Sequence, residues 1–289
     1  MEGNHSVRSQ KPLLASLPHS GELIPAEAPW LEGLPERLLM FDVDRFVDVL
    51  YAPAFAALGM AHVKSDWHRY AVDLNRWTSD VDVDSVAGAE KPSGSFPRGL
   101  HWSITTKGDR LMPHPMSRSV HEAIVRLYFE PFHERVRAEL ERLRERGAAA
   151  TFHVDLHSMP SIGTNEHRDP GERRADVVIS DLDGRSCSAE FKDFVIRAYS
   201  SAGFKVACNW PYKGGRLTET YGRPERAQHA IQIELNRALY MDEETKLLRP
   251  DRLAPMQGAL LGAMGAIHDS LLDLPTSPPL RDGRIAAKI

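Results

Sequence analysis

The stretch Ala149-Ala150-Thr151-Phe152-His153-Val154-Asp155-Leu156 decides the fold class, because it is apolar at most positions and predicts a buried strand. It follows a long amphipathic helical pattern over residues 116–146, which Gly147 is expected to end. Within that helix, His133 is interpreted as a packed core histidine. A helix leading into a buried strand is the repeating unit of α/β proteins.

The same alternation of helices and strands continues on both sides of this stretch. Pro53 is expected to kink or split the helix in which it falls. Together the elements predict an α/β fold in a single domain, with a mostly parallel or mixed sheet and helices on both faces. Further strands are expected at residues 13–17, 70–75, 176–180, 204–208 and 228–235, and further helices at 35–58, 188–201 and 256–272.

The bulk properties are those of an ordinary globular protein. The chain has 289 residues, 42% hydrophobic and 26% charged, with a formal net charge of −4. This charge gives no reason to expect nucleic acid or an anionic membrane as a partner. The domain is expected to span residues 12–274, between a disordered N-terminus (1–11) and a flexible tail (275–289).

Several absences point to a cytoplasmic protein. No apolar run approaches the length of about 18 residues that a membrane span needs, and residues 1–10 lack the apolar stretch of a secretory signal. The two cysteines, Cys187 and Cys208, have no C-x-x-C spacing and are interpreted as reduced core thiols. Neither a nucleophile elbow, Gly-x-Ser-x-Gly, nor a phosphate-binding loop occurs.

Polar residues stand at the ends of the predicted strands. His19, Asn75, His157 and Asn209 each end or directly follow one. Because ligands of open α/β sheets bind beyond the carboxyl ends of the strands, these residues are expected to converge on one rim. The segment 79–114, rich in Gly, Pro, Ser and Asp, is expected to act as an active-site flap.

A metal site is the first hypothesis for that rim. His19 and Glu22, three residues apart in a turn, could bind one cation together with His157. Asp44 competes with Glu22 as the carboxylate ligand, and both alternatives stay open. Asp155 shares a strand face with His157 and could orient its ring. The alternative is a polar strand face without a metal.

Substrate-binding and catalytic residues are the second hypothesis. Asn75 and Arg76 could clamp a substrate carboxylate, since guanidinium binds carboxylate in a bidentate manner, although a surface salt bridge is equally expected. Glu234 lies in an apolar strand, where burial would raise its pKa towards that of a general base. The alternative for Glu234 is a structural ion pair with Arg237 or with Lys213, which lies in a glycine-containing loop that could close on the substrate.

Six segments together resemble the N-formylglutamate amidohydrolase family, which is related to the zinc carboxypeptidases. The resemblance covers residues 12 to 272 and implies a phosphorylase/hydrolase-like α/β fold with one Zn²⁺. It also implies hydrolysis of N-formyl-L-glutamate to formate and L-glutamate, a late step of histidine degradation. The segments are Pro18-His19-Ser20-Gly21, Val72-Asp73-Leu74-Asn75-Arg76, Tyr128-x-x-Pro131-x-His133, Asp155-x-His157-Ser158, Asn209-x-Pro211-Tyr212-Lys213-Gly214-Gly215 and Gln232-x-Glu234-Leu235-Asn236-Arg237-Ala238-Leu239-Tyr240-Met241.

The sequence therefore predicts a zinc-dependent amidohydrolase of a small N-acyl amino acid, with Glu234 as general base. Arg98 or Lys213 is expected to stabilise the oxyanion. The first alternative is a carboxypeptidase-like or deacylating hydrolase of another N-acyl amino acid. The second is a non-catalytic binding protein with the same clamp and no working metal.

Overall fold

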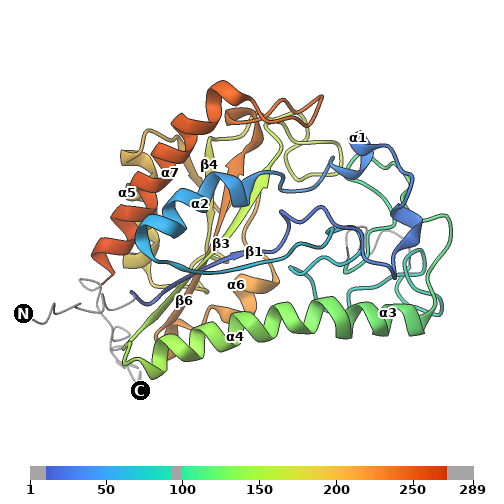
Figure 1. Ribbon diagram of the computed structural model, residues 1–289, viewed down its shortest axis with the longest axis horizontal. Coiled ribbons are helices and arrows are strands. Elements are labelled where there is room, and N and C mark those ends of the chain that lie inside the picture. The colour runs from blue at the N-terminus through green and yellow to red at the C-terminus, as the bar shows by residue number, and fades with distance from the viewer. Residues whose placement is uncertain (1–10, 93–98, 272–289) are drawn as a thin grey trace, which may run out of the picture.

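A six-stranded mixed sheet runs through the middle of the molecule (Figure 1). The structure is a computed structural model, and it describes residues 11–92 and 99–271. The strands lie in the order β2-β1-β3-β6-β4-β5. Neighbouring strands are parallel except β4 and β6, which are antiparallel. Their bounds are Leu13–Leu17 (β1), Ala61–Lys64 (β2), Thr151–Met159 (β3), Val177–Ser180 (β4), Val206–Cys208 (β5) and Gln228–Asn236 (β6).

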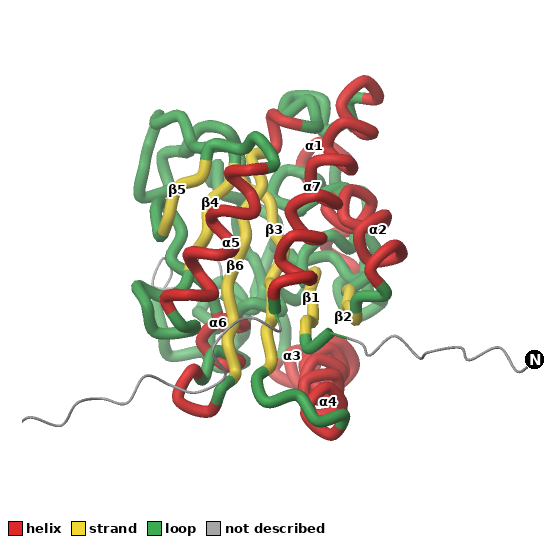
Figure 2. Tube along the Cα trace, turned by 90° about the vertical axis from the view of Figure 1, so that its left-hand side faces the viewer, coloured by secondary structure: helices red, strands yellow, loops and turns green. Residues whose placement is uncertain are grey.

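Helices cover both faces of this sheet, as Figures 1 and 2 show. One face packs against α2, α5 and α7, and the other against α4 and α6. The α-helices are Glu36–Leu39 (α1), Val47–Leu58 (α2), Arg118–Ile124 (α3), Glu130–Glu145 (α4), Ala189–Ser201 (α5), Arg216–Tyr221 (α6) and Pro250–Ser270 (α7), with a π-helical turn at Val125–Phe129 and 3₁₀ turns at Pro29–Leu31, Pro224–Arg226 and Arg237–Leu239.

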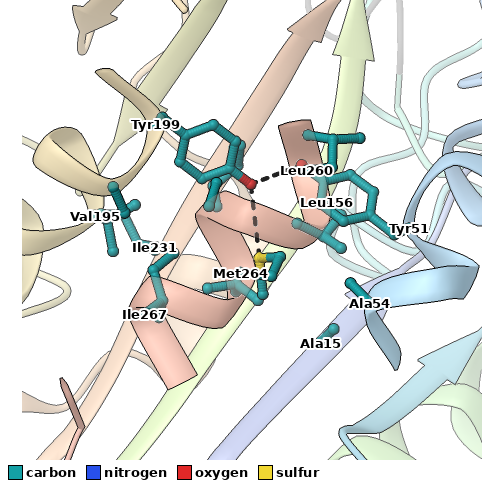
Figure 3. Packing of buried hydrophobic residues seen from close by; sticks show 14 of the residues in the cluster. Ala15, Tyr51, Ala54, Leu156, Val195, Tyr199, Ile231, Leu260, Met264 and Ile267 are labelled. Carbon is teal, nitrogen blue, oxygen red and sulfur yellow. Dashed lines mark hydrogen bonds between the residues drawn. The ribbon is translucent and has the colours of Figure 1, made fainter. Parts of the chain in front are cut away.

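The face covered by α2, α5 and α7 holds the larger apolar core (Figure 3). Leu156 and Ile231 from the sheet pack there with Leu260 of α7, and all three side chains are buried. At the same layer the hydroxyl groups of Tyr51 and Tyr199 lie 2.7 Å apart. Each buried hydroxyl group thereby has a hydrogen-bond partner within the apolar core and needs no water molecule there.

The sequence predicted most of these elements. The sheet and its helices form one α/β fold, as expected, and strands β1, β3, β4, β5 and β6 lie where the patterns placed them. The helix expected at 188–201 is α5, whose N-terminus is capped by the Ser188 hydroxyl accepting the Phe191 N–H. Gly147 follows α4 with a positive φ, as a helix-ending glycine does.

The strand expected at residues 70–75 is wrong. This segment is a buried irregular loop, whose backbone hydrogen bonds join it to the segment after residue 99. Asp73 N–H donates to the Leu100 carbonyl at 2.7 Å, and Trp102 N–H donates to the Tyr70 carbonyl at 3.0 Å. The alternation of apolar residues therefore reflects packing on two sides of a loop and not pairing in a ladder. The sheet gains instead β2, which no pattern indicated.

The single helix expected at residues 35–58 is also wrong, because α1 and α2 are separated by residues 40–46. Pro53 does not split α2 and lies inside it. Proline removes one intrahelical N–H donor. The carbonyl of Val49, four residues earlier, accepts instead from the Gln257 side chain at 3.0 Å. An interhelical bond from α7 thus makes the proline tolerable.

Other expectations concern parts of the chain at its edges. The predicted N-terminal disorder and flexible tail lie outside the described residues, apart from Lys11. Within residues 79–114, the described part contains isolated bridges and no helix or longer strand. Across the described ranges, no helix combines the length and the apolar character needed to cross a membrane.

Candidate active site

A cavity of about 220 Å³ lies at the carboxyl ends of β1, β3 and β6, where parallel strands bring distant segments together. In the parallel register of β3 and β6, His157 lies beside Glu234. The residues that line the cavity include His19, Asp44, Arg69, Asn75, Arg76, Trp102, Thr106, His157, His167, Tyr212, Gln232, Glu234 and Arg237.

Two histidines and one carboxylate meet in this cavity. His157 Nδ1 lies 3.0 Å from Asp44 Oδ2, and His19 Nδ1 lies 3.5 Å from the same oxygen. All three residues are buried, and their candidate ligand atoms lie within 4.8 Å of one another. Two imidazole nitrogens and one carboxylate oxygen form a donor set typical of a catalytic zinc site, which has three protein ligands.

The far nitrogen of each imidazole ring is held by a second carboxylate. His19 Nε2 lies 2.7 Å from Asp73 Oδ1, and His157 Nε2 lies 2.7 Å from Asp155 Oδ2. A proton on Nε2 in each ring leaves the lone pair on Nδ1, directed at Asp44. His19 Nδ1 is buried and, among the described residues, forms no hydrogen bond, with Asp44 Oδ2 at the longer distance of 3.5 Å. A cation at this point would satisfy that nitrogen.

Asp44 is oriented by groups on its other oxygen. Asp44 Oδ1 accepts from Arg237 Nη2 at 3.1 Å and from the Ser158 hydroxyl at 3.2 Å. Burial alone would raise its pKa, but the contacts with His157 and His19 outweigh burial and hold the pKa well below its usual value. Asp44 is therefore an anion whose Oδ2 stays directed towards the two histidines.

Asp155 continues a polar chain into the sheet. Its Oδ1 accepts from the Ser16 hydroxyl of β1 at 2.6 Å, and that hydroxyl lies 2.7 Å from His153 Nε2. Burial would lower the pKa of His157, but the charge and hydrogen bond of Asp155 and the contact with Asp44 raise it well above its usual value. His157 is thus held between two carboxylates, those of Asp155 and Asp44.

Glu22 lies apart from this cluster. Its carboxylate accepts from Arg45 Nε at 2.7 Å, its side chain is 38% exposed, and it does not line the cavity. The His-x-x-Glu spacing was thus the weaker of the two signals for a carboxylate near His19. Asp44 comes close because its N–H donates to the His19 carbonyl at 3.0 Å, which joins the two loops.

Glu234 lines the cavity from β6 and is 5% exposed. Its Oε1 accepts from the Gln232 side-chain amide at 2.8 Å. Burial raises the pKa of Glu234, against the opposing charge of His157. A buried carboxylate with a raised pKa is suited to exchange a proton near neutral pH.

Asn75 and Arg76 line the same cavity from the loop that replaces the expected strand. Asn75 Oδ1 accepts from the Leu217 N–H of α6 at 2.8 Å, whereas its Nδ2 group has only long contacts of 3.4 Å, to Gln232 Oε1 and His157 Nε2. Arg76 Nη1 donates to the Asn75 carbonyl at 2.9 Å. Both side chains carry N–H donors and lie at the wall of the cavity.

The remaining sequence candidates lie elsewhere. Lys213 pairs with Asp183 at 2.8 Å, is exposed, and does not line the cavity. Asn209 donates to Asp181 at 2.7 Å and supports the loop after β5. Arg98 lies outside the described residues.

Sequence reasoning gave no role in the site to Asp73 or Arg69, and gave Arg237 only that of an ion-pair partner of Glu234. Asp73 was quoted only as part of a motif, and its contact with His19 spans 54 positions of the chain. Arg69 and Arg237 line the cavity, and both lie close to Asp44. These residues could have been recognised because they are charged and lie in otherwise apolar segments. A charge that is buried requires a partner, so each of them indicates a polar contact in the interior.

Known proteins resemble this chain over most of its length. Residues 11–241 match the family model of N-formylglutamate amidohydrolase. N-formylglutamate deformylases from Pseudomonas aeruginosa and Pseudomonas putida are 32% and 31% identical, over 82% and 89% of this chain and 85% and 92% of theirs. A crystal structure of N-formylglutamate amidohydrolase from Ralstonia eutropha JMP134 superimposes with a TM-score of 0.83 and 27% identity, covering 92% of this chain and 95% of that one. This chain belongs to the N-formylglutamate amidohydrolase family.

Proposed function

We propose that this protein is a metal-dependent amide hydrolase that cleaves N-formyl-L-glutamate into formate and L-glutamate. The observation that carries the proposal is the convergence of His19 Nδ1 and His157 Nδ1 on Asp44 Oδ2, in the cavity that Glu234 also lines. The two deformylases that it resembles over more than four-fifths of its length support the same reaction. Such an activity would place the protein late in histidine degradation.

We assign the metal to His19, His157 and Asp44, and not to Glu22. Three buried donors of the N, N, O type fit zinc, and the buried Nδ1 of His19 has no other partner. Asp73 and Asp155 would fix the rings so that both Nδ1 atoms face the cation. When bound, zinc supplies Lewis acidity, which acidifies a water molecule and polarises a carbonyl oxygen.

Glu234 is the proposed proton carrier. It takes the proton from the attacking water and returns it to the nitrogen that leaves as the amine of glutamate. The Gln232 amide holds one of its oxygens and so directs the carboxylate within the cavity. Burial, which raises the pKa of this carboxyl, makes the carboxylate a stronger base and so favours uptake of the proton from water.

Asn75 and Arg76 are the proposed carboxylate clamp. N-formyl-L-glutamate carries two carboxylates, and a guanidinium fork beside an amide donor matches one of them in charge and geometry. Lys213 has no place in this proposal, because its ammonium group is paired with Asp183 outside the cavity.

The test is an assay for free amine and formate with N-formyl-, N-acetyl- and N-succinyl-L-glutamate as substrates. We expect the N-formyl compound to be hydrolysed fastest, with activity lost on chelation and restored by zinc. His157→Ala should abolish this activity, whereas Glu22→Ala, the matched control in the same region, should retain it. Faster hydrolysis of the N-acetyl or N-succinyl compound would mean that N-formyl-L-glutamate is not the preferred substrate. Undiminished activity after complete metal removal would overturn the proposed metal dependence.

A further inference from the structure

His133 of α4 contacts the loop that carries the proposed clamp. It is buried, and its Nε2 lies 3.0 Å from the carbonyl oxygen of Leu74, the residue before Asn75. Its Nδ1 lies 2.9 Å from the hydroxyl group of Tyr221, the last residue of α6. A single imidazole ring thus links the long helix, the clamp loop and α6.

The hydrogen-bond roles in this link follow from chemistry. A carbonyl oxygen only accepts, so His133 donates from Nε2 to Leu74, which leaves Nδ1 as an acceptor for the Tyr221 hydroxyl. The same hydroxyl also lies 3.2 Å from the His133 carbonyl oxygen, to which it can donate as well. Burial, together with the charge of Arg216, lowers the pKa of His133 to about 3, so the ring is neutral at physiological pH. A neutral ring has one donor and one acceptor, and both are used here.

α6 contacts the clamp from the other side. Leu217 N–H donates to Asn75 Oδ1 at 2.8 Å. A Cβ atom at Gly215 would lie 2.3 Å from Asn75 Nδ2, so only glycine allows this approach. His133 holds the backbone before Asn75, and Leu217 of α6 holds the Asn75 side chain. The two supports are connected because His133 is hydrogen-bonded to Tyr221, which lies in the same helix as Leu217.

The clamp loop needs such support, because residues 70–75 form no strand and have no ladder of hydrogen bonds. A displacement of about 1 Å at a substrate-positioning group can cost about a hundredfold in kcat/KM. We propose that His133 is a positioning residue for substrate binding, which fixes Asn75 and Arg76 through the Leu74 carbonyl without touching the substrate. This role rests on the clamp assigned under the proposed function.

The rival interpretation is that His133 only fills space. Its ring lies 4.3 Å from the ring of Phe129 and 5.5 Å from that of Phe132, between centroids, as a core side chain would. The two interpretations differ in whether the hydrogen bond from His133 Nε2–H to the Leu74 carbonyl matters for substrate binding. Packing alone requires bulk, whereas positioning requires an N–H at the place of Nε2.

The experiment compares His133→Leu, which keeps bulk and removes the donor, with His133→Gln, whose amide can donate to Leu74. We expect His133→Leu to raise KM for N-formyl-L-glutamate roughly ten- to hundredfold, with kcat changed less than about threefold, because a clamp contributes uniform binding. His133→Gln should recover most of the loss. The proposal is overturned if leucine leaves KM unchanged, or if leucine and glutamine raise it equally at equal melting temperature.

Two further measurements keep the outcomes distinct. If His133→Leu does not fold, His133→Met supplies a second donor-free side chain, and failure of both to fold would assign His133 to packing and overturn the positioning role. If the wild type hydrolyses no N-formyl amino acid, the proposed function fails. Calorimetric binding of N-formyl-L-glutamate to the same variants would then test His133 separately, with equal affinity in wild type and His133→Leu counting against it.

Discussion

The two faces of β3 and β6 are built on the same strands and differ in almost every other respect. On one face Phe152, Val154 and Leu156 of β3 join the apolar core under α2, α5 and α7. On the other face His153, Asp155 and His157 are equally buried, but each has a polar partner from another strand or loop. β6 repeats the pattern, with Ile231 and Ile233 against Gln232 and Glu234.

The two faces contribute differently to stability and to chemistry. Burying apolar area stabilises the fold, at about 25 cal/mol per Å². Burying charged groups costs free energy unless they are paired, and replacing a buried ion pair by apolar side chains is often neutral or stabilising. A polar row retained across the centre of a sheet is therefore explained by chemistry rather than by stability. If the two faces are independent, a substitution on the polar face should change activity and one on the apolar face should change stability.

The largest expected effect is on the polar face, at Glu234. Glu234→Gln is nearly isosteric and removes only the capacity to carry a proton. General base catalysis contributes about 10²–10⁴-fold, so kcat should fall by that factor with metal content and melting temperature nearly unchanged. A fall of less than about threefold would assign the proton transfer to another residue.

The matched change on the apolar face is Leu156→Ala, next to His157 in the chain and 1% exposed. Truncating a buried leucine to alanine costs about 2–5 kcal/mol, because it leaves a cavity. We expect the free energy of unfolding in urea to fall by that amount, while kcat/KM of the folded enzyme stays close to that of the wild type. A loss of activity without a loss of stability would show that the two faces are coupled.

Acid should act on the polar face through His153, which is one of several buried histidines with a lowered pKa. Burial lowers the pKa of His153 from 6.5 to about 4, so the folded state resists a proton that the unfolded chain accepts. Its contribution is complete above pH 6.5 and is lost as the pH falls towards 4, by roughly 3 kcal/mol at about 1.36 kcal/mol per unit. Chemical unfolding between pH 7 and pH 4 should show a shallower pH dependence in His153→Gln than in the wild type. If the free energies of unfolding of the two proteins change equally with pH, His153 does not cause the acid sensitivity.

The smallest expected effect is at the rim, in Arg76→Lys. Lysine keeps the charge and loses the fork, so binding of the carboxylate should weaken by about 1.5–3 kcal/mol, or roughly ten- to hundredfold in kcat/KM. The loss should appear with N-formyl-L-glutamate and be small with analogues in which the clamped carboxylate is an amide. Equal losses on acid and amide would mean that Arg76 supports the loop.

The sequence predicted the polar face better than the loops around it. Period-2 alternation in β3 was enough to place Asp155 beside His157, because side chains two apart share a strand face. It could not decide between Glu22 and Asp44, since that depends on how the loop after β1 meets residues 40–46. Asp73 and Arg69 were missed for the same reason. Their segment alternates like a strand, but its hydrogen bonds go to residues about 30 positions later.

The central claim is that His19, His157 and Asp44 bind one metal ion at the carboxyl edge of the polar face. The most direct measurement is a crystal structure of the protein with zinc, with anomalous diffraction data collected at the zinc edge. The account predicts one strong peak per chain, within coordination distance of His19 Nδ1, His157 Nδ1 and Asp44 Oδ2, at about 2.0–2.2 Å. A peak at Glu22, or an empty cluster in protein that is fully active, would contradict it.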